Sequence, residues 1–571
     1  MKRIVSLLTE EIYDLAIIGG GIYGAYLAWD AALRGLTVAL VDKGDFGNAT
    51  SANSQKIIHG GLRYLQHANF KRMRESIRER RTLMRSAPHL VYPIPFLIPF
   101  YDGLIGGKGI MSLALKLNDL ISFDRNWNMV SDKFIPGSHV ISRAECLQLC
   151  PGLDQTGLSG GVIFYDGQVY NSERLILSVL QSATNAGADL ANYIKVTGFI
   201  QKGNITTGFR AKDVITGNSL EVQAKIIVNC SGPWTDQVLD LLKTKRYRKR
   251  INWFKAVILV TRPLFQKMAV GVPCTQLYRD DDAVINKGYR YFFITPWRNT
   301  SLVGTFYTPY DGDPDDFKVT EKDIRDFINE VNAAYPAADI KRQDVYLVYG
   351  GLLPNDDRAS KSGEIQYAKR YKIYDHEKDD GIPGLISVVG VKYTTARDVA
   401  EKTIDLVLKK LGIRAVRCRT EVTPVYGGEI EQYEDFMNLE IQNKPQGMSA
   451  EVIRHLISTY GSNYREILQY CENNPAWGQS ALNTSPVLQG EIVHGIREEM
   501  AQRLGDVIFR RTELGTAGYP GDTCIATCAA IMATELGWDE EKTQREIAEV
   551  RATFSQMGCE QWTTMTKVNV S

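Results

Sequence analysis

The segment His59-Gly-Gly-Leu-Arg63-Tyr64 brings three chemically different side chains together in a short stretch of chain. An imidazole titrates near neutral pH, so His59 could accept a proton from a substrate hydroxyl. A guanidinium can bind a phosphate or a carboxylate through two hydrogen bonds, and a phenol can donate another. We therefore expect a site in which His59 is the base and Arg63 and Tyr64 contact an anionic substrate. The alternatives are a structural histidine and an internal salt bridge of Arg63.

A glycine-rich turn near the N-terminus has the pattern GxGxxG, at Gly19, Gly21 and Gly24. The first glycine permits a tight turn, the second lets the backbone approach a pyrophosphate, and the third packs a helix on a strand. Asp42, 23 residues after Gly19, could accept hydrogen bonds from ribose hydroxyls. These residues predict a dinucleotide site, against the alternative of a turn without a ligand. The motif alone does not choose between NAD and FAD.

Three elements must hold this turn in place. Leu15–Ile18 predicts a buried parallel strand, Ala25–Arg34 predicts a helix that stops at Gly35, and Thr37–Asp42 predicts a second buried strand. Together they form a β-α-β unit, so the first domain is expected to be α/β with a doubly wound sheet. Farther along the chain, closely spaced prolines are expected to interrupt regular structure: Pro88, Pro93, Pro95 and Pro99.

The stretch Thr50-Ser-Ala-Asn-Ser-Gln-Lys-Ile-Ile-His-Gly-Gly-Leu-Arg-Tyr-Leu65 carries a resemblance to a known family. It is similar to the T-S-x-x-S-x-K-L-I-H-G-G-x-R-Y-L stretch of the FAD-dependent glycerol-3-phosphate dehydrogenases. Further blocks resemble that family in the same order, from about residue 12 to 555: Phe164-Tyr-Asp-Gly-Gln168, Val228-Asn-Cys-Ser-Gly-Pro-Trp234, Ser301-Leu-Val-Gly-Thr305, Gly390-Val-Lys-Tyr-Thr-Thr395 and Phe509-Arg-Arg-Thr-Glu-Leu-Gly515.

The resemblance implies an FAD site built from small and hydroxyl-bearing residues at strand-to-helix turns. Such residues let the backbone approach a flat, polyanionic ligand. Besides the GxGxxG glycines and Asp42, the residues implied to line the cofactor are Thr50, Ser51, Ser54 and Ile58, with the backbone of Val196 beside the adenine and Gly232, Gly390 and Thr394 at the flavin end.

The same resemblance implies the oxidation of sn-glycerol 3-phosphate to dihydroxyacetone phosphate. A hydride would pass to FAD and the electrons would pass on to a quinone. Lys392, in the Gly390 block, would stabilise an oxyanion or the reduced flavin. A second basic contact to the substrate falls at Lys369 or Arg370, where the register is ambiguous.

Two positions depart from the family pattern. Leu353, in Tyr349-Gly-Gly-Leu-Leu-Pro354, stands where the family's Y-S-G-x-R-P has an arginine. Losing that arginine would remove a charge-assisted contact of about 2–3 kcal/mol. Ile258, in Lys255-Ala-Val-Ile258, stands where the family has a histidine. The pocket could therefore take glycerol 3-phosphate, a related polyol phosphate, or a less anionic alcohol or amine.

Changes in the expected secondary structure along the chain predict three domains. Residues 12–235 and 345–412 are expected to form a discontinuous FAD-binding domain, and 236–344 a strand-rich substrate domain over the flavin ring. Helix follows helix after about residue 425, so 425–571 is expected to be an all-helical C-terminal domain, with a possible role in dimerisation.

Composition excludes several classes of protein. The 571 residues carry 67 Lys plus Arg against 66 Asp plus Glu, so no overall field favours nucleic acid. Apolar runs are too short for a transmembrane helix or a secretory signal. The 9 cysteines are sparse and contain no CxxC, so we expect no metal site, no disulfide scaffold and a cytoplasmic location. Cys146/Cys150 and Cys524/Cys528 are expected to be buried, small apolar residues.

Two features favour attachment to the inner face of the plasma membrane. The run Lys243-Thr-Lys-Arg-Tyr-Arg-Lys-Arg250 could bind anionic lipid, and the amphipathic helix Ile110–Ile121 could lie in the interface. The alternatives are a solvated basic face and a helix that covers a core. Reoxidation by O2 competes with a quinone acceptor. Two other functions stay open: an FAD oxidase of amines or amino acids, and a non-catalytic flavin-binding sensor or adaptor.

Overall fold

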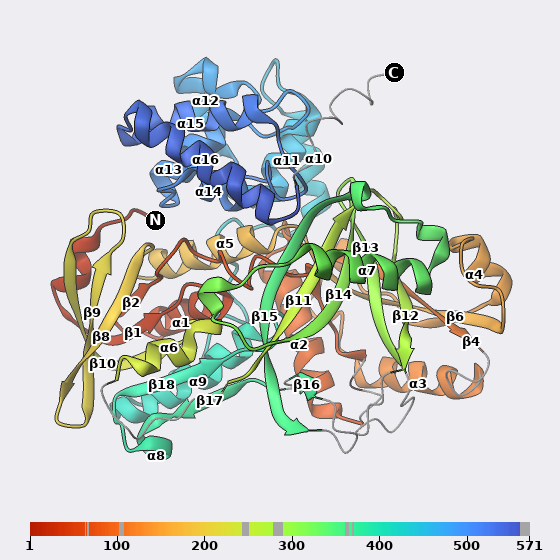
Figure 1. Ribbon diagram of the computed structural model, residues 1–571, viewed down its shortest axis with the longest axis horizontal. Coiled ribbons are helices and arrows are strands. Elements are labelled where there is room, and N and C mark those ends of the chain that lie inside the picture. Colours follow the sequence, from red (N-terminus) through yellow and green to blue (C-terminus); the bar gives the residue numbers. More distant parts are fainter. Residues whose placement is uncertain are drawn as a thin grey trace.

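A computed structural model describes residues 1–62, 64, 68–101, 108–242, 251–277, 289–359, 365–367 and 370–559. Two sheets and a separate group of helices make up the fold (Figure 1). The first sheet has eight strands, and along its main path they follow in the order β17 (Lys372–Asp375), β18 (Leu385–Val389), β10 (Ser219–Asn229), β1 (Ile12–Ile18), β2 (Val38–Val41) and β7 (Ala188–Ala191).

The first sheet is the doubly wound layer expected from the N-terminal pattern. Strands β18, β10, β1, β2 and β7 run parallel, with β17 antiparallel at the edge. One face is covered by helices α1 (Ile22–Leu33), α5 (Ser172–Asn185) and α9 (Ala396–Leu411). The other face is covered by β8 (Ile194–Lys202) and β9 (Ile205–Asp213), which extend from β10 as an antiparallel ribbon. Because both faces are buried, the central strands are apolar without alternation.

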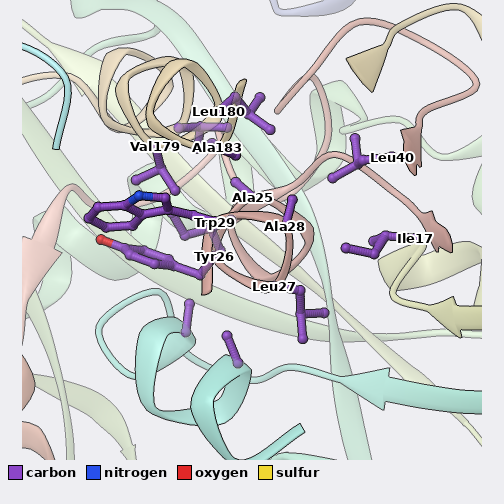
Figure 2. Close-up of a cluster of buried hydrophobic side chains, with 14 of the residues drawn as sticks. Ile17, Ala25, Tyr26, Leu27, Ala28, Trp29, Leu40, Val179, Leu180 and Ala183 are labelled. Carbon is purple, nitrogen blue, oxygen red and sulfur yellow. The ribbon is translucent and has the colours of Figure 1, made fainter. Parts of the chain in front are cut away.

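Helix α1 is apolar on nearly all sides because it lies between the sheet and two other helices. Ile17 and Leu40 contact it from the strands, and Val179 and Ala183 contact it from α5 (Figure 2). Trp29 is 1% exposed, which corresponds to about 1.5–3 kcal/mol of favourable burial for such a side chain. This packing holds the N-terminus of α1, and therefore the glycine turn, against the ends of the strands.

The second sheet has ten strands and draws them from distant parts of the chain. Its order is β16 (Ile365–Tyr367), β15 (Val345–Ala359), β11 (Trp253–Thr261), β14 (Thr300–Tyr310), β13 (Tyr289–Trp297), β12 (Ala269–Leu277), β4 (Val91–Tyr101), β6 (Leu158–Val169) and β3 (Ile57–Ile58), with β5 (His139–Ser142) beside β6. The expected range 236–344 holds only β11 to β14. The remaining strands join through pairings between segments far apart in sequence, which local patterns do not report.

The expectation that the prolines interrupt regular structure is wrong for three of them. Pro93, Pro95 and Pro99 lie within β4, which pairs with β6 along its length. All three occupy odd positions, so the even-numbered residues remain available to donate to β6. On its other side β4 meets β12 only at Phe96 and Leu97, where no proline stands.

Helices α2 (Phe70–Ser86), α3 (Lys108–Ile121), α4 (Arg143–Leu149) and α7 (Glu321–Ala334) pack around the second sheet. Two short helices, α6 (Thr235–Asp240) and α8 (His376–Asp380), lie beside the first sheet. The arginine-rich helix α2 pairs internally, for example Arg74 with Asp124 and Arg80 with Asp166. Arg81 also pairs with Asp124, and Arg78 pairs with Asp398.

The chain after Val389 is helical in the part that the structure describes. Helix α9 is followed by α10 (Tyr433–Gln442), α11 (Ala450–Tyr460), α12 (Arg465–Asn473), α13 (Gln489–Glu498), α14 (Leu504–Asp506), α15 (Asp522–Leu536) and α16 (Glu540–Gln556). Helices α10 to α16 gather above α5 and one end of the second sheet (Figure 1). They share an apolar core with that sheet, in which Ile258 and Trp297 meet Val507 and Ile525.

The four cysteines that were expected to be buried lie in two different cores: Cys524 and Cys528 in the core shared with the C-terminal helices, and Cys146 and Cys150 in a core under the second sheet. Cys146, Cys150, Cys524 and Cys528 are buried and form no disulfide.

Among the residues whose structure is described, no helix combines the length and the apolar content that crossing a bilayer requires.

Candidate active site

The GxGxxG turn lies at the carboxyl ends of β1 and β10, where a doubly wound sheet binds its ligand. Gly19 has φ +112°, and a Cβ there would lie 2.6 Å from the carbonyl oxygen of Cys230. A Cβ on Gly24 would lie 1.8 Å from the carbonyl oxygen of Gly19, so only glycine lets α1 pack this close to the turn. Gly21 faces the Ser51 hydroxyl, with 3.0 Å between its Cβ position and Oγ.

Asp42 follows β2 and closes the same turn. Its carboxylate accepts hydrogen bonds from the backbone N–H groups of Gly20, at 2.7 Å, and Gly44, at 2.9 Å. Burial raises the pKa of Asp42 to about 6, although both amide donors act in the opposite direction. The two amides therefore fix the carboxylate at the carboxyl end of β2, beside the glycine turn.

The segment after Asp42 connects the two sheets. The Ser51 hydroxyl accepts from the amide of Ile22, at the first turn of α1. The Thr50 hydroxyl donates to the carbonyl of Leu352 at 3.2 Å and accepts from its amide at 3.3 Å, which joins this segment to β15. The Ser54 hydroxyl accepts from the amide of Lys56, and Ile58 is fully buried in β3.

Lys56 anchors the start of β3 and was not assigned a role from the sequence. Its ammonium is fully buried and lies 2.9 Å from the carboxylate of Glu173. It also donates to the Ser172 hydroxyl and lies 5.1 Å from the centre of the Trp297 ring. Burial lowers the pKa of Lys56, and Glu173 opposes that shift. This ion pair joins α5, which covers the first sheet, to the start of β3 in the second sheet.

The His-Gly-Gly segment is shaped by Asp166 of β6. The carboxylate of Asp166 accepts from the amide of Gly60 at 2.6 Å, pairs with Arg80 at 2.5 Å, and lies 3.4 Å from Nδ1 of His59. A Cβ on Gly60 would lie 2.1 Å from the Arg80 guanidinium, so a larger residue at position 60 would have to displace that guanidinium from Asp166. Gly61 has φ +86°, which turns the chain toward Tyr64. The His59 side chain is 52% exposed and therefore available to a ligand.

A third segment, 390–394, meets the other two at the end of β18. The Thr394 hydroxyl accepts a hydrogen bond from the amide of His59 at 3.1 Å. The ammonium of Lys392 lies 3.8 Å from the centre of the Tyr64 ring. The structure therefore brings His59, Tyr64, Lys392 and Thr394 together, as expected from their motifs.

The remaining expected residues lie around this centre or outside the described part of the chain. Gly232, φ +58°, follows β10, and Val196 is buried in β8 against Ile18 and Val41. Arg370 is exposed, two residues before Lys372, which pairs with Val389. Arg63, Lys369 and the basic run 243–250 lie outside the described residues.

The two departures from the family pattern lie on one face of the second sheet. Leu353 pairs with Phe254, and Gly351 pairs with Ala256, so these residues share a face. A Cβ on Gly351 would lie 3.1 Å from the Thr50 side chain, which places this face against the dinucleotide segment. Ile258 lies farther along the same strand face, buried in the core shared with the C-terminal helices.

Comparison with known proteins agrees with this arrangement. A family described as FAD dependent oxidoreductase matches residues 14–393. The chain belongs to this family. A second family, described as the C-terminal domain of alpha-glycerophosphate oxidase, matches residues 418–543.

The similarity between this flavoprotein and individual relatives extends over almost the entire length of the chain. A Synechocystis glycerol-3-phosphate dehydrogenase is 34% identical over 95% of this chain and 96% of the relative. The human mitochondrial glycerol-3-phosphate dehydrogenase is 30% identical over 96% of this chain and 74% of the relative. A solved glycerol-3-phosphate dehydrogenase from Bacillus halodurans, complexed with FAD, is 26% identical and covers 97% of each chain with a TM-score of 0.75. These comparisons confirm the expected family and fold.

The flavoprotein is an oxidoreductase and its cofactor is FAD. The residues present fit that cofactor. The glycine turn brings backbone without side chains to the N-terminus of α1, where a pyrophosphate could approach, and Asp42 offers an acceptor for ribose. When bound, FAD accepts a hydride, and the protein supplies orientation and charge around it.

Three structural features of the site were not found from the sequence. Asp166 lies in a block that was quoted for its resemblance, but its contact with Gly60 depends on the pairing of β3 with β6. Tyr23 lies inside the GxGxxG motif, yet its hydroxyl contacts Lys392, 369 residues away in sequence. The sequence did offer a sign of the role of Lys56: this lysine directly precedes the apolar pair Ile57 and Ile58, and a lysine next to a buried strand usually needs a partner.

Proposed function

We propose that this flavoprotein oxidises sn-glycerol 3-phosphate, or a related polyol phosphate, to dihydroxyacetone phosphate. The observation that supports this most directly is the meeting of three segments at the carboxyl end of the first sheet. The His59 amide donates to Thr394, and the Lys392 ammonium lies over the Tyr64 ring. A proton acceptor and a cation therefore lie within one small region. The full-length similarity to proteins named glycerol-3-phosphate dehydrogenase supports the substrate class.

Each of these residues has a chemical task in the proposed reaction. His59 takes the proton from the substrate hydroxyl at its ring nitrogen, while Asp166 orients the imidazole through the contact at Nδ1. Lys392 stabilises the negative charge that develops as the proton and hydride leave. The substrate phosphate is held by Arg63, with Tyr64 and Arg370 or Lys369 as further contacts.

An anaerobic titration of the FAD-loaded protein tests the proposal. Loss of the flavin absorbance at about 450 nm on adding sn-glycerol 3-phosphate, but not glycine, proline or a primary amine, is the expected result. Bleaching by an amino acid or an amine without any by glycerol 3-phosphate would overturn it. Glycerol and inorganic phosphate serve as controls for the two halves of the substrate.

A less anionic alcohol is a second candidate substrate, because one wall beside the dinucleotide segment is apolar. Phe254, Ala256 and Leu353 share the sheet face that contacts Thr50. None of these side chains can pair with a phosphate. The same titration separates the two candidate substrates. Stronger bleaching by unphosphorylated polyols than by glycerol 3-phosphate would favour the less anionic alcohol.

We further propose that the protein works at the cytoplasmic face of the plasma membrane and passes electrons to a quinone. Large apolar side chains are exposed in the last turn of α3 and shortly after it: Leu120 is 69% exposed, and Phe123 and Trp127 are each 63% exposed. Such side chains favour an interfacial position. Vesicle co-sedimentation, followed by a comparison of quinone reduction with oxygen uptake, tests both parts. Rapid peroxide formation without quinone reduction would contradict the acceptor.

A further inference from the structure

The hydroxyl of Tyr23 joins the two ends of the dinucleotide site. Tyr23 stands in the first turn of α1, inside the GxGxxG motif and directly before Gly24. Its hydroxyl donates to the carbonyl of Lys392 at 2.7 Å. It also accepts from the amides of Val391, at 3.2 Å, and Lys392, at 3.1 Å. One side chain therefore satisfies polar groups of two successive residues in the turn after β18.

The ring of Tyr23 acts on the residue just before them. A Cβ on Gly390 would lie 2.0 Å from the Tyr23 ring, and more than one ring atom lies within 3 Å of that position. Glycine at 390 is therefore required by the tyrosine ring and not by a positive φ. The ring and the hydroxyl together define the path of the backbone from Gly390 to Lys392.

The turn is also held at its far end. The Thr394 hydroxyl accepts from the His59 amide, and the Lys392 ammonium lies over the Tyr64 ring. Tyr23 fixes the backbone of Lys392 and the Tyr64 ring lies against its ammonium, so the side chain is restrained at both ends. The position of the ammonium therefore depends on Tyr23, which is itself fixed in the first turn of α1 beside the glycine turn.

We propose that Tyr23 is a positioning residue that places the Lys392 ammonium at the flavin end of the site and thereby sets how strongly the flavin accepts electrons. This inference rests on the role of Lys392 given under the proposed function, but not on the identity of the substrate. A fixed cation favours the anionic forms of a flavin, including its adduct with sulfite. An unconstrained cation is solvated and contributes less.

Sulfite binding to the FAD-loaded protein measures this effect without any substrate. We expect Tyr23→Phe to retain FAD, because the ring packing on Gly390 remains. Its sulfite dissociation constant should rise about five- to tenfold, the equivalent of one net hydrogen bond. Lys392→Met should raise it at least as much, and the double variant no further than Lys392→Met alone, because Tyr23 acts through the lysine.

Tyr26→Phe is the matched control. Tyr26 lies one turn farther along α1, its hydroxyl has no hydrogen-bond partner among the described residues, and the substitution leaves the 390–392 turn intact. An unchanged sulfite constant in Tyr23→Phe, additive effects in the double variant, or no effect of Lys392→Met would each overturn the proposal. So would loss of FAD from Tyr23→Phe, which would make Tyr23 a cofactor-retention residue. Failure of glycerol 3-phosphate to bleach the wild type would affect only the substrate assignment.

Discussion

Arg511 donates two hydrogen bonds to the carboxylate of Asp45, at 2.6 and 2.8 Å, and neither side chain is exposed to solvent. Arg511 belongs to the C-terminal helical region, whereas Asp45 lies three residues after Asp42 in the dinucleotide segment. Burial alone would raise the pKa of Asp45, but Arg511 and Arg510 hold it well below its usual range. The helical region therefore stabilises the loop that carries Asp42.

Removing this arginine should destabilise the protein strongly. Arg511→Ala leaves the Asp45 carboxylate buried with one of its two guanidinium partners gone, so the free energy of unfolding should fall by about 3–5 kcal/mol. Urea unfolding followed by circular dichroism measures the change. Arg497→Ala is the control, since the Arg497 side chain in its pair with Glu535 is 44% exposed and should contribute about 1 kcal/mol or less. Equal losses in the two variants would contradict the assignment.

FAD affinity should depend on pH through Asp42. Ribose hydroxyls donate to an ionised carboxylate, but burial raises the pKa of Asp42 to about 6. FAD binding should therefore weaken as the pH falls through about 6, and fluorescence quenching of FAD measures this. Asp42→Asn should bind more weakly at pH 7 and lose the pH dependence. A pH dependence that persists in this variant would assign the titration to another group.

The same shift affects the stability of the FAD-free protein with the opposite sign. In the unfolded chain the Asp42 carboxyl has its ordinary pKa of 3.8, whereas in the folded protein this pKa is about 6. Between these two pH values the folded state therefore binds more protons than the unfolded state. This residue's contribution to the free energy of unfolding should therefore decrease as the pH rises from 3.8 toward about 6. Comparison of wild type with Asp42→Asn by thermal unfolding across this range isolates the effect.

His59→Gln should lower kcat about 10²- to 10⁴-fold without releasing FAD, because the side chain is the proposed general base and is 52% exposed. Stopped-flow measurement of flavin reduction reports the step directly. His139→Gln, at an exposed position of β5, should leave the rate unchanged. Normal flavin reduction in His59→Gln would exclude the residue as the base.

Leu353→Arg tests whether the apolar wall contacts the substrate. An arginine on this face of β15 would add a charge-assisted contact, so the concentration of glycerol 3-phosphate that gives half-maximal bleaching should fall about tenfold or more. The concentration for unphosphorylated glycerol should stay the same. Leu353→Met keeps the volume and should change neither value. If both variants behave alike, this wall lies away from the phosphate.

Membrane attachment should depend on the exposed apolar side chains near α3. Leu120→Ser together with Trp127→Ser should weaken binding to anionic vesicles about tenfold or more, because apolar area is lost from the interface. Co-sedimentation with vesicles measures the bound fraction. Leu439→Ser, at a 54% exposed position of α10 in the C-terminal region, is the matched control. An equal loss of binding in the control would assign the membrane-facing surface elsewhere.

Local pattern in the sequence was sufficient for the glycine turn and the elements around it. Leu15–Ile18, Ala25–Arg34 and Thr37–Asp42 correspond to β1, α1 and β2 within a few residues. These elements are decided by neighbouring residues: apolar runs form the strands, and glycines form the turn because a Cβ would collide with the backbone. Motif order along the chain was likewise sufficient to identify the family.

Tertiary structure alone decided which distant segments meet. The strand pairing of β4 with β6, despite prolines at 93, 95 and 99, depends on which neighbour each backbone amide faces. The contact of Tyr23 with Lys392 and that of Asp45 with Arg511 span 369 and 466 residues. Such contacts arise because packing brings the ends of several strands to one place, and no property of either residue's neighbours in sequence encodes that distance.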